Sequence, residues 1–326
     1  MPQPDHSYVI KARTEINVER KYHMALLSGM RAWFGGRIFR KVMIPWLLIL
    51  PIALIHLIVV IGPTIIGLYF SLTKWAGIGQ STFIGLENFK NILTNDDEFW
   101  PTFGHNMLWM LFFLTIPMFM GLFASSLMAQ IKRGAMFIRT IIFVPYILPS
   151  VISASVWRML LNGNIGIGPK LASWGIPGLD QAWLGDPRTA LPAIAFADNW
   201  HWWGFLMILF LTAMQNISPD LYDAAKIDGA NWVQEFVNVT LPGIRPTIVF
   251  MLMMTAVWSF LVFDYVFLLT QGGPAGSSEV FGTLIYKDAF ARFEFGYATA
   301  LGLTICVFAG FIITLFTYMR RRGWDI

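Results

Sequence analysis

Long apolar segments dominate this chain and alternate with shorter polar ones. An apolar segment of about 20 residues is long enough to cross the hydrocarbon core of a bilayer as a helix. The pattern predicts six transmembrane helices, with the approximate limits 43–70, 106–129, 140–161, 190–213, 247–269 and 297–319. Because backbone polar groups inside a bilayer must be satisfied within the chain, the predicted fold class is an all-α membrane protein.

The composition agrees with a membrane protein and excludes several other classes. Hydrophobic residues make up 56% of the 326 positions and charged residues 13%, with a mean hydropathy of +0.60, whereas a soluble domain is more charged. The single cysteine, Cys306, cannot build a disulfide framework or a thiolate metal cluster within this chain. The basic residues lie beside apolar segments rather than on one helix face, so we expect no nucleic-acid partner.

The distribution of Lys and Arg predicts the orientation. If the N-terminus is cytoplasmic, the inside segments 1–42, 130–139, 214–246 and 320–326 hold 16 of the 23 basic residues, and the outside loops hold six. Cytoplasmic loops of membrane proteins carry the excess of Lys and Arg. Both termini are therefore predicted to be cytoplasmic.

This topology divides the chain into three parts. Residues 1–42 mix basic, aromatic and apolar residues, which suits either an amphipathic helix on the anionic inner leaflet or a charged leader that only sets the topology. No small-residue cleavage site follows a short apolar core, so the first helix is predicted to stay as an anchor. Residues 43–319 form the six-helix domain with its cytoplasmic loop at 214–246, and residues 320–326 form a basic tail.

The loop contains a polar, helix-forming segment, residues 221–246, which reads LYDAAKIDGANWVQEFVNVTLPGIRP. Ser218 is a good N-cap, Pro219 suits the first helical position and Gly229 suits a left-handed stop. These signals predict a short helix over about 219–228. One face of this helix carries Leu221, Ala224, Ala225 and Asp228.

A second short helix is predicted to follow the first. Asn231 can cap it, with Gln234 three residues later completing a capping-box pair; Leu241-Pro242 is expected to end it, and Pro246 to start the fifth transmembrane helix. Two such helices are too polar for lipid and too small to have a core of their own. They need a protein surface, which is either the inner mouth of this same chain or a partner.

The spacing of this loop resembles the cytoplasmic signature of binding-protein-dependent ABC importer permeases, which runs E-A-A, three residues, G, about nine residues, a hydrophobic residue, x, L-P. The matching residues here are Asp223, Ala224, Ala225, Gly229, Leu241 and Pro242. Asp223 replaces the commoner Glu and keeps the negative charge on a shorter side chain. The resemblance implies that residues 219–231 form coupling helices seated in a cleft of an ATPase.

Other segments resemble the carbohydrate-uptake branch of that family, which is related to maltose-type permeases. They read FIGLENFKNIL after the first predicted helix, FVPYILPSVISASVWRML in the third, and FDYVFLLTQGGPAGSSEVFGTLIYKDAF followed by EFGYATALGL near the C-terminus. The resemblance thus covers residues from about 43 to the C-terminus. It implies a six-helix type I importer permease in a bacterial inner membrane.

The same resemblance implies the partner subunits and the solute. The chain would pair with a second permease subunit, which is usually a different chain in this branch, with two copies of a cytoplasmic ATPase, and with an extracytoplasmic solute-binding protein that delivers a carbohydrate. An oligosaccharide is expected, and both neutral and acidic ones remain open. The residues implied to dock the ATPase are Leu221, Asp223, Ala224, Ala225, Asp228, Gly229, Leu241 and Pro242.

The chain is not expected to be an enzyme or to bind a cofactor. It contains no G-x-x-x-x-G-K-[ST] motif, so ATP and Mg²⁺ would be bound by the partner ATPase subunits. Its five His residues have no metal-ligand spacing to one another or to carboxylates, so no metal site is expected either.

A few polar and aromatic residues inside the predicted helices are candidates for the transport path. Asp198 and Asp264 are each placed within a helix, where a carboxylate is costly unless it faces water or a partner; either could instead be an interfacial anchor. Flat rings beside hydrogen-bonding groups suit a sugar, although an aromatic belt at the interface has similar residues. The predicted path residues are Asn199, Trp202, Trp203, Trp258, Ser259, Asp264 and Tyr265.

Three other functions remain as alternatives. A secondary transporter could use Asp198 and Asp264 to bind coupling ions, and would depend on an ion gradient instead of ATP. An intramembrane enzyme would show activity as a purified single chain. An ABC permease could also carry a solute that is not a sugar.

Overall fold

The computed structural model describes residues 24, 41, 43–131, 133–176 and 180–321. The predicted amphipathic helix of residues 1–42 therefore lies almost wholly outside the described residues, and so does most of the basic tail. By its internal contacts the chain divides into two units, 1–66 and 67–326. The site lies in the second unit.

The first apolar segment forms one helical stretch, Ile44–Ser71, in three successive parts. These are α2 (Ile44–His56), the π-helical turn η2 (Leu57–Ile61) and α3 (Gly62–Ser71). The wide turn ends two residues before Pro63, which has no N–H to donate. A π-helical turn lets the helix continue past such a residue.

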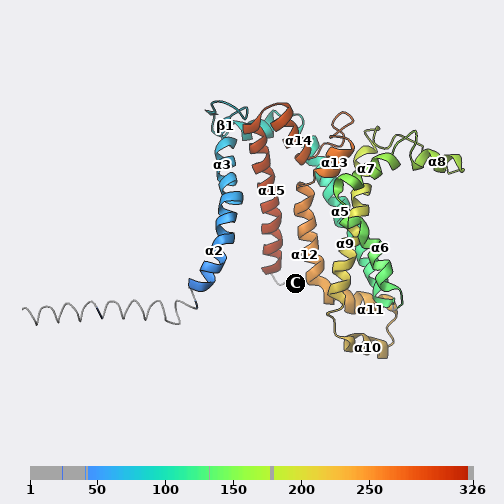
Figure 1. Cartoon of the computed structure of the whole chain (residues 1–326). Coiled ribbons are helices and arrows are strands. Elements are labelled where there is room, and N and C mark those ends of the chain that lie inside the picture. The colour runs from blue at the N-terminus through green and yellow to red at the C-terminus, as the bar shows by residue number, and fades with distance from the viewer. Residues whose placement is uncertain (1–23, 25–40, 42, 132, 177–179, 322–326) are drawn as a thin grey trace, which may run out of the picture. The chain divides into compact units, whose positions relative to one another are not determined.

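The regular structure of the second unit, as far as its residues are described, consists of helices and one short hairpin (Figure 1). Strands β1 (Thr73–Lys74) and β2 (Thr82–Phe83) pair antiparallel, with Thr73 opposite Phe83. The helices in its first half are α4 (Glu87–Thr94), α5 (Phe99–Gln130), α6 (Ala135–Ile147), α7 (Ser150–Leu160) and α8 (Ile167–Ser173). The remaining elements are α9 (Ala190–Met214), α10 (Pro219–Ile227), α11 (Trp232–Glu235), η3 (Phe236–Thr240), α12 (Leu241–Phe260), α13 (Asp264–Leu269), α14 (Phe281–Tyr286), η4 (Lys287–Ala291) and α15 (Phe295–Arg321).

Helices α5 and α9 form the centre of this unit and pack along most of their lengths. Leu206 and Phe210 of α9 are fully buried, and α12 contributes the buried Ile244 and Met251 to the same core cluster. Small residues allow the close approach: a Cβ placed on Gly121 of α5 would lie 2.7 Å from the Cβ of Leu206. Short helix separations at small residues are typical of packing between membrane helices.

The described residues include four helices that are long and apolar enough to cross a membrane. They are Ile44–Ser71, Phe99–Gln130, Trp232–Phe260 and Phe295–Tyr318. Helix α9, with 25 residues, is about 37 Å long at 1.5 Å per residue, which also suffices to span a bilayer. The predicted all-α membrane fold is confirmed.

The third predicted transmembrane helix, 140–161, is wrong as a single rod. Helices α6 and α7 meet at an angle of 96°. Leu148, between them, has the extended backbone angles φ −70° and ψ 134°. The ring of Pro149 disfavours a helical conformation for the residue before it, and here the helix breaks at that residue.

The limits predicted for the fifth helix, 247–269, are wrong at both ends. The helix begins at Trp232 and runs without a stop through η3 and Leu241-Pro242 to Phe260. Pro242 lies in the first turn of α12 directly after the π-helical turn, which accommodates its missing N–H instead of ending the helix. The chain then breaks at 261–263, so Asp264 starts a separate helix, α13.

Charged side chains join the start of α5 to η4 and the loop after it. The Glu98 carboxylate accepts hydrogen bonds from Lys287 Nζ at 3.1 Å and from Arg292 Nη2 at 2.7 Å, and Arg292 Nη1 donates to the fully buried Asp288 at 2.6 Å. Burial raises the pKa of Asp288 to about 6. Burial also pushes the pKa of Glu98 upwards, but the hydrogen bonds from Arg292 and Lys287 outweigh it and hold this pKa below its ordinary value.

Replacing Glu98 with Gln should destabilise the protein at pH 7 by about 1 kcal/mol, because the carboxylate is 38% exposed and solvent screens its pairs. A carboxylate with a lowered pKa stabilises the fold above its unfolded pKa, whose ordinary value is 4.5, and loses that effect as the pH falls through its folded pKa. The difference between the two proteins, measured by thermal unfolding in detergent, should therefore shrink below about pH 4.5. The neighbouring substitution Asp97→Asn, on an exposed side chain, should have little effect; an equal loss from both variants would contradict this role.

Candidate functional site

Helix α10 begins and ends as its local sequence predicts. The Ser218 Oγ accepts the backbone N–H of Asp220 at 3.3 Å, and Pro219 occupies the first turn. The helix ends at Ile227, and Gly229 has the left-handed φ of +78°, which glycine adopts without strain. The predicted N-cap and glycine stop are confirmed.

Helix α11 starts with the predicted capping box. The Asn231 side chain accepts the N–H of Gln234 at 3.0 Å, and the Gln234 side chain accepts the N–H of Asn231 at 2.8 Å. This reciprocal pair satisfies two backbone donors at the helix start. The chain therefore turns sharply at 228–231 and continues at once into the long helix that ends at Phe260.

Helix α10 is exposed along its length and has no buried residue. Two of its apolar side chains, Leu221 and Ile227, are 55% and 86% exposed. The Asp223 carboxylate pairs only with Lys226 of the same helix, at 3.6 Å between exposed groups, among the described residues. This exposure disfavours the interpretation that α10 pads the mouth of its own chain.

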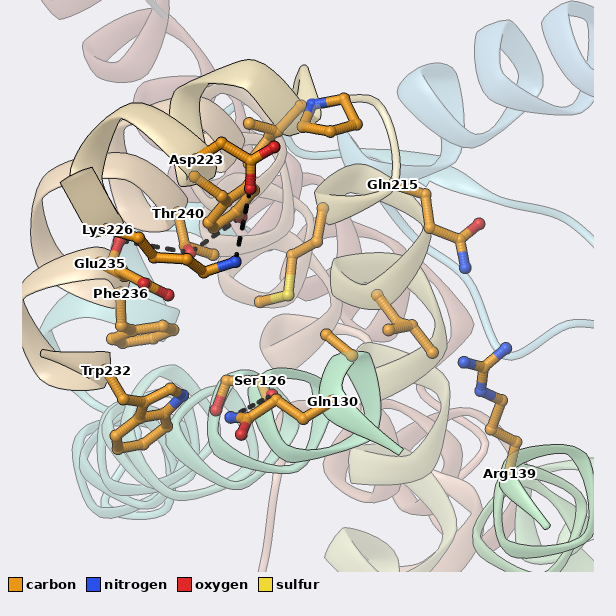
Figure 2. A pocket seen from close by; sticks show the side chains of 16 residues that line it. Ser126, Gln130, Arg139, Gln215, Asp223, Lys226, Trp232, Glu235, Phe236 and Thr240 are labelled. Carbon is orange, nitrogen blue, oxygen red and sulfur yellow. Dashed lines mark hydrogen bonds and ion pairs between the residues drawn. The ribbon is translucent and has the colours of Figure 1, made fainter. Parts of the chain in front are cut away.

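A pocket of about 470 Å³ lies between this loop and the ends of α5 and α9 (Figure 2). Trp232 and Phe236 lie parallel with their ring centroids 6.1 Å apart, on the side of the pocket where α5 contributes Ser126 and Gln130. On the loop side, the Tyr222 and Thr240 hydroxyls are hydrogen-bonded at 3.0 Å. This hydrogen bond holds the base of the loop, which extends away from the bundle. Figure 1 shows α10 beyond the ends of the long helices.

The structure places the predicted docking residues in two groups. The first group lies on α10 and the turn after it, and all its members are exposed except the half-buried Ala225: Leu221, Asp223, Ala224, Ala225, Asp228 and Gly229. Leu241 and Pro242 instead lie in the first turn of α12, with Pro242 exposed and Leu241 half-buried. They do not end the second short helix, as the sequence predicted.

A second cavity, of about 390 Å³, lies where α6, α7, α9, α12 and α13 meet. Five of the seven predicted path residues line it: Trp202, Trp258, Ser259, Asp264 and Tyr265. Asn199 and Trp203 are not among its lining residues. Asn199 is buried, and its amide points to the sulfur of Met120 on α5 at 3.4 Å.

Aromatic rings and the carboxylates of Asp198 and Asp264 line this cavity, which we call the acidic cavity. The Trp202 and Trp258 rings meet edge to face with centroids 4.9 Å apart. The Ser150 hydroxyl donates to Asp264 at 2.9 Å, and Asp198 lies 3.8 Å from His201. The arrangement offers flat surfaces with hydrogen-bonding groups beside them, which suits a bound polar solute with apolar faces.

Several lining residues were not predicted from the sequence. Tyr146 and Ser150 reach the cavity because the chain bends by 96° between α6 and α7. Pro145 and Pro149, four residues apart inside a predicted transmembrane helix, were the available signal of that bend. Thr255 lies one turn before Ser259 on α12 and could be found only from the burial of that face.

The described residues contain no group of three or more His, Cys, Asp or Glu side chains that could hold a metal ion. Neither site therefore has the ligands for metal-assisted chemistry within the described part of the chain. Both have features of binding sites.

Comparisons with known proteins agree on one family. Residues 118–322 match the family described as binding-protein-dependent transport system inner membrane component. The probable ABC transporter permease protein YurN of Bacillus subtilis is 31% identical over 268 residues, which cover 81% of this chain and 91% of YurN. The trehalose/maltose transport system permease protein MalF of Thermococcus litoralis is 29% identical over 87% of this chain and 96% of MalF.

A solved structure shares the fold. It is the crystal structure of a bacterial ABC transporter involved in the import of the acidic polysaccharide alginate, and one of its chains matches with a TM-score of 0.78 and 26% identity over 89% of this chain and 100% of that chain. The predicted type I permease fold and the resemblance to carbohydrate permeases are thus confirmed. This chain belongs to the family of binding-protein-dependent transport system inner membrane components, as a multi-pass ABC transporter permease.

Proposed function

We propose that this chain forms half of the translocation path of an ATP-driven importer for an oligosaccharide. An extracytoplasmic binding protein delivers the solute, a second permease subunit forms the other half of the path, and two cytoplasmic ATPase subunits drive the cycle. Relatives named for trehalose/maltose and starch-degradation-product transport support the carbohydrate assignment. A second alginate-importer structure is a complex with an alginate pentasaccharide-bound periplasmic protein, which supports the binding-protein partner.

The observation that carries this proposal is the uncovered helix α10. A helix that exposes Leu221 and Ile227 and buries no residue within its own chain fits a partner surface. Ala224 and Ala225 between these two residues let a partner approach the backbone closely. With the loop on the cytoplasmic side, α10 would dock into the ATPase as a coupling helix.

The continuous helix from Trp232 to Phe260 supports a mechanical connection between the two sites. Its 29 residues extend about 43 Å at 1.5 Å per residue. One end follows the docking loop directly, and the other end carries Trp258 and Ser259 at the acidic cavity. Displacement of the loop by the ATPase would therefore move the cavity wall as part of one rigid element, which is one way to alternate access to a site.

Hydrolysis takes place outside this chain in the proposed mechanism. The sequence has no phosphate-binding G-x-x-x-x-G-K-[ST] loop, so ATP and Mg²⁺ are assigned to the partner ATPases and no cofactor to this chain. This chain supplies a docking helix, a rigid connection and half of a cavity.

Replacing Trp258 with Ala should reduce solute-stimulated ATP hydrolysis more than basal hydrolysis. The substitution removes a flat face of the cavity while leaving the docking loop in place. The measurement is ATP hydrolysis in liposomes that contain this chain with its co-purifying subunits and binding protein, over a panel of oligosaccharides. Trp174→Ala, on an exposed side chain directly after α8, is the control and should leave both rates unchanged.

Two results would count against the proposal. Equal loss of stimulated and basal hydrolysis in the Trp258 variant would indicate a structural role for that ring. Uptake that requires an ion gradient and proceeds without ATP would identify a secondary transporter instead.

A further inference from the structure

The charged side chains that line the acidic cavity carry a net negative charge. Asp198 and Asp264 both line it, and no Lys or Arg is among its lining residues in the described part of the chain. The other ionisable groups among these lining residues are the phenols of Tyr146 and Tyr265 and the His201 imidazole. When His201 is protonated, Asp198 at 3.8 Å balances its charge and Asp264 remains.

A second observation shows that the cavity is built to receive hydrogen-bonding groups. Thr255 is 2% exposed and lines the cavity, and its hydroxyl has no hydrogen-bond partner among the described residues. The same holds for the indole N–H of Trp202. Buried polar groups in folded proteins are nearly always paired, so these two residues of the cavity wall keep unused hydrogen-bonding capacity.

The available groups complement hydroxyls. The carboxylates of Asp198 and Asp264 accept hydrogen bonds, the Trp202 indole donates one, and the Thr255 hydroxyl does both. A sugar hydroxyl can pair with each of these groups, and the Trp202 and Trp258 rings cover the apolar face of a sugar ring. A uronate would place its own carboxylate beside those of Asp198 and Asp264, with no Lys or Arg among the described lining residues to offset the repulsion, and like charges oppose binding.

We propose that this half of the path selects uncharged saccharides and rejects acidic ones, with Asp198 and Asp264 as the residues that determine this specificity. This inference rests on the proposed function. It also separates this chain from its structural relative, the importer of an acidic polysaccharide, in spite of the shared fold.

The test compares binding of a glucose trimer and a mannuronate trimer to the complete transporter in liposomes, without the binding protein, so that the selectivity of the binding protein does not enter. The unaltered transporter should bind the glucose trimer at least tenfold more tightly. In the double variant Asp198→Asn and Asp264→Asn, the preference should fall to about one, because amides keep the shape and hydrogen bonds but remove the charge.

Two control variants test whether the preference depends on the charge of the cavity carboxylates. Asp186→Asn removes a carboxylate that pairs with Arg188 outside the cavity, and should leave the tenfold preference intact. Ser150→Ala removes the hydrogen bond to Asp264 and keeps the charge, so it should also preserve the preference. Co-purification of the other subunits and the unfolding temperature of each variant report whether it is assembled and folded.

The outcomes distinguish this inference from the function on which it rests. Equal or tighter binding of the mannuronate trimer by the unaltered transporter would overturn the inference alone, and so would a preference that survives removal of both charges in a folded variant. If neither trimer binds and no saccharide stimulates ATP hydrolysis with the binding protein present, the carbohydrate assignment fails and the inference fails with it.

Discussion

Replacing Gly229 with Val should strip the ATPase subunits from the purified permease while leaving its membrane insertion intact. Gly229 has a φ of +78°, which a β-branched residue rarely adopts. The strain costs about 1–2 kcal/mol, which the loop can relieve only by taking another path between α10 and α11. In the proposed mechanism docking depends on the position of α10, so we expect at least tenfold less ATPase retained on a detergent column.

The controls distinguish the effect of backbone strain at Gly229 from the effect of a steric clash with the added side chain. An added Cβ at Gly229 would meet nothing within 4 Å, so a steric clash is not expected. Gly229→Asn should retain the ATPase, since Asn tolerates a left-handed backbone. Gly134→Val applies the same strain at a φ of +72°, also in open space, but before α6 in a different loop, and it should retain the ATPase as well. Full retention by Gly229→Val would contradict the docking role of this turn.

Replacing Gly204 with Ala should destabilise the membrane domain by up to about 3 kcal/mol, at the upper end of what overpacking costs. A Cβ at this position of α9 would lie 2.2 Å from the carbonyl oxygen of Ile142 in α6. That neighbour is backbone, so α6 and α9 would have to separate. The measurement is unfolding in detergent, followed by helix content or by the loss of bound subunits.

The matched control, Gly104→Ala, should not lower the stability. Gly104 lies in α5, and a Cβ there would meet nothing within 4 Å. Because Gly in a helix is less favourable than Ala by about 0.5–1 kcal/mol, Gly104→Ala should be neutral or slightly stabilising. If Gly204→Ala is equally harmless, α6 and α9 do not meet as closely as the structure shows.

The packing of α6 on α9 also matters for the acidic cavity. Phe205, which follows Gly204 in α9, stacks on Tyr146 of α6 with ring centroids 4.5 Å apart. Tyr146 and Trp202 then line the cavity from these two helices. We therefore expect the Gly204 variant to lose solute binding together with stability, whereas the charge variants of Asp198 and Asp264 should change selectivity.

Local signals in the sequence were sufficient for both ends of α10 and for the start of α11. The N-cap at Ser218, the glycine at 229 and the capping box at Asn231 each depend on side chains within three residues of the backbone they satisfy. The family signature was found for the same reason, because it is a fixed spacing along one short segment. Prolines misled in both directions: Pro242 was expected to stop a helix that a π-helical turn carries past it, whereas Pro149 breaks a helix that was predicted to continue.

Length, hydropathy and capping act within a segment, so the membrane class, the approximate apolar segments and the starts of the two short loop helices could be predicted from the sequence. The packing of the helices was needed to show that one helix links the loop to the cavity and that Asp198 and Asp264 line the same space. A cavity is made by residues far apart in the chain, and the faces they present depend on how whole helices pack. That packing is a non-local balance of close contacts, which no pattern along a single segment contains.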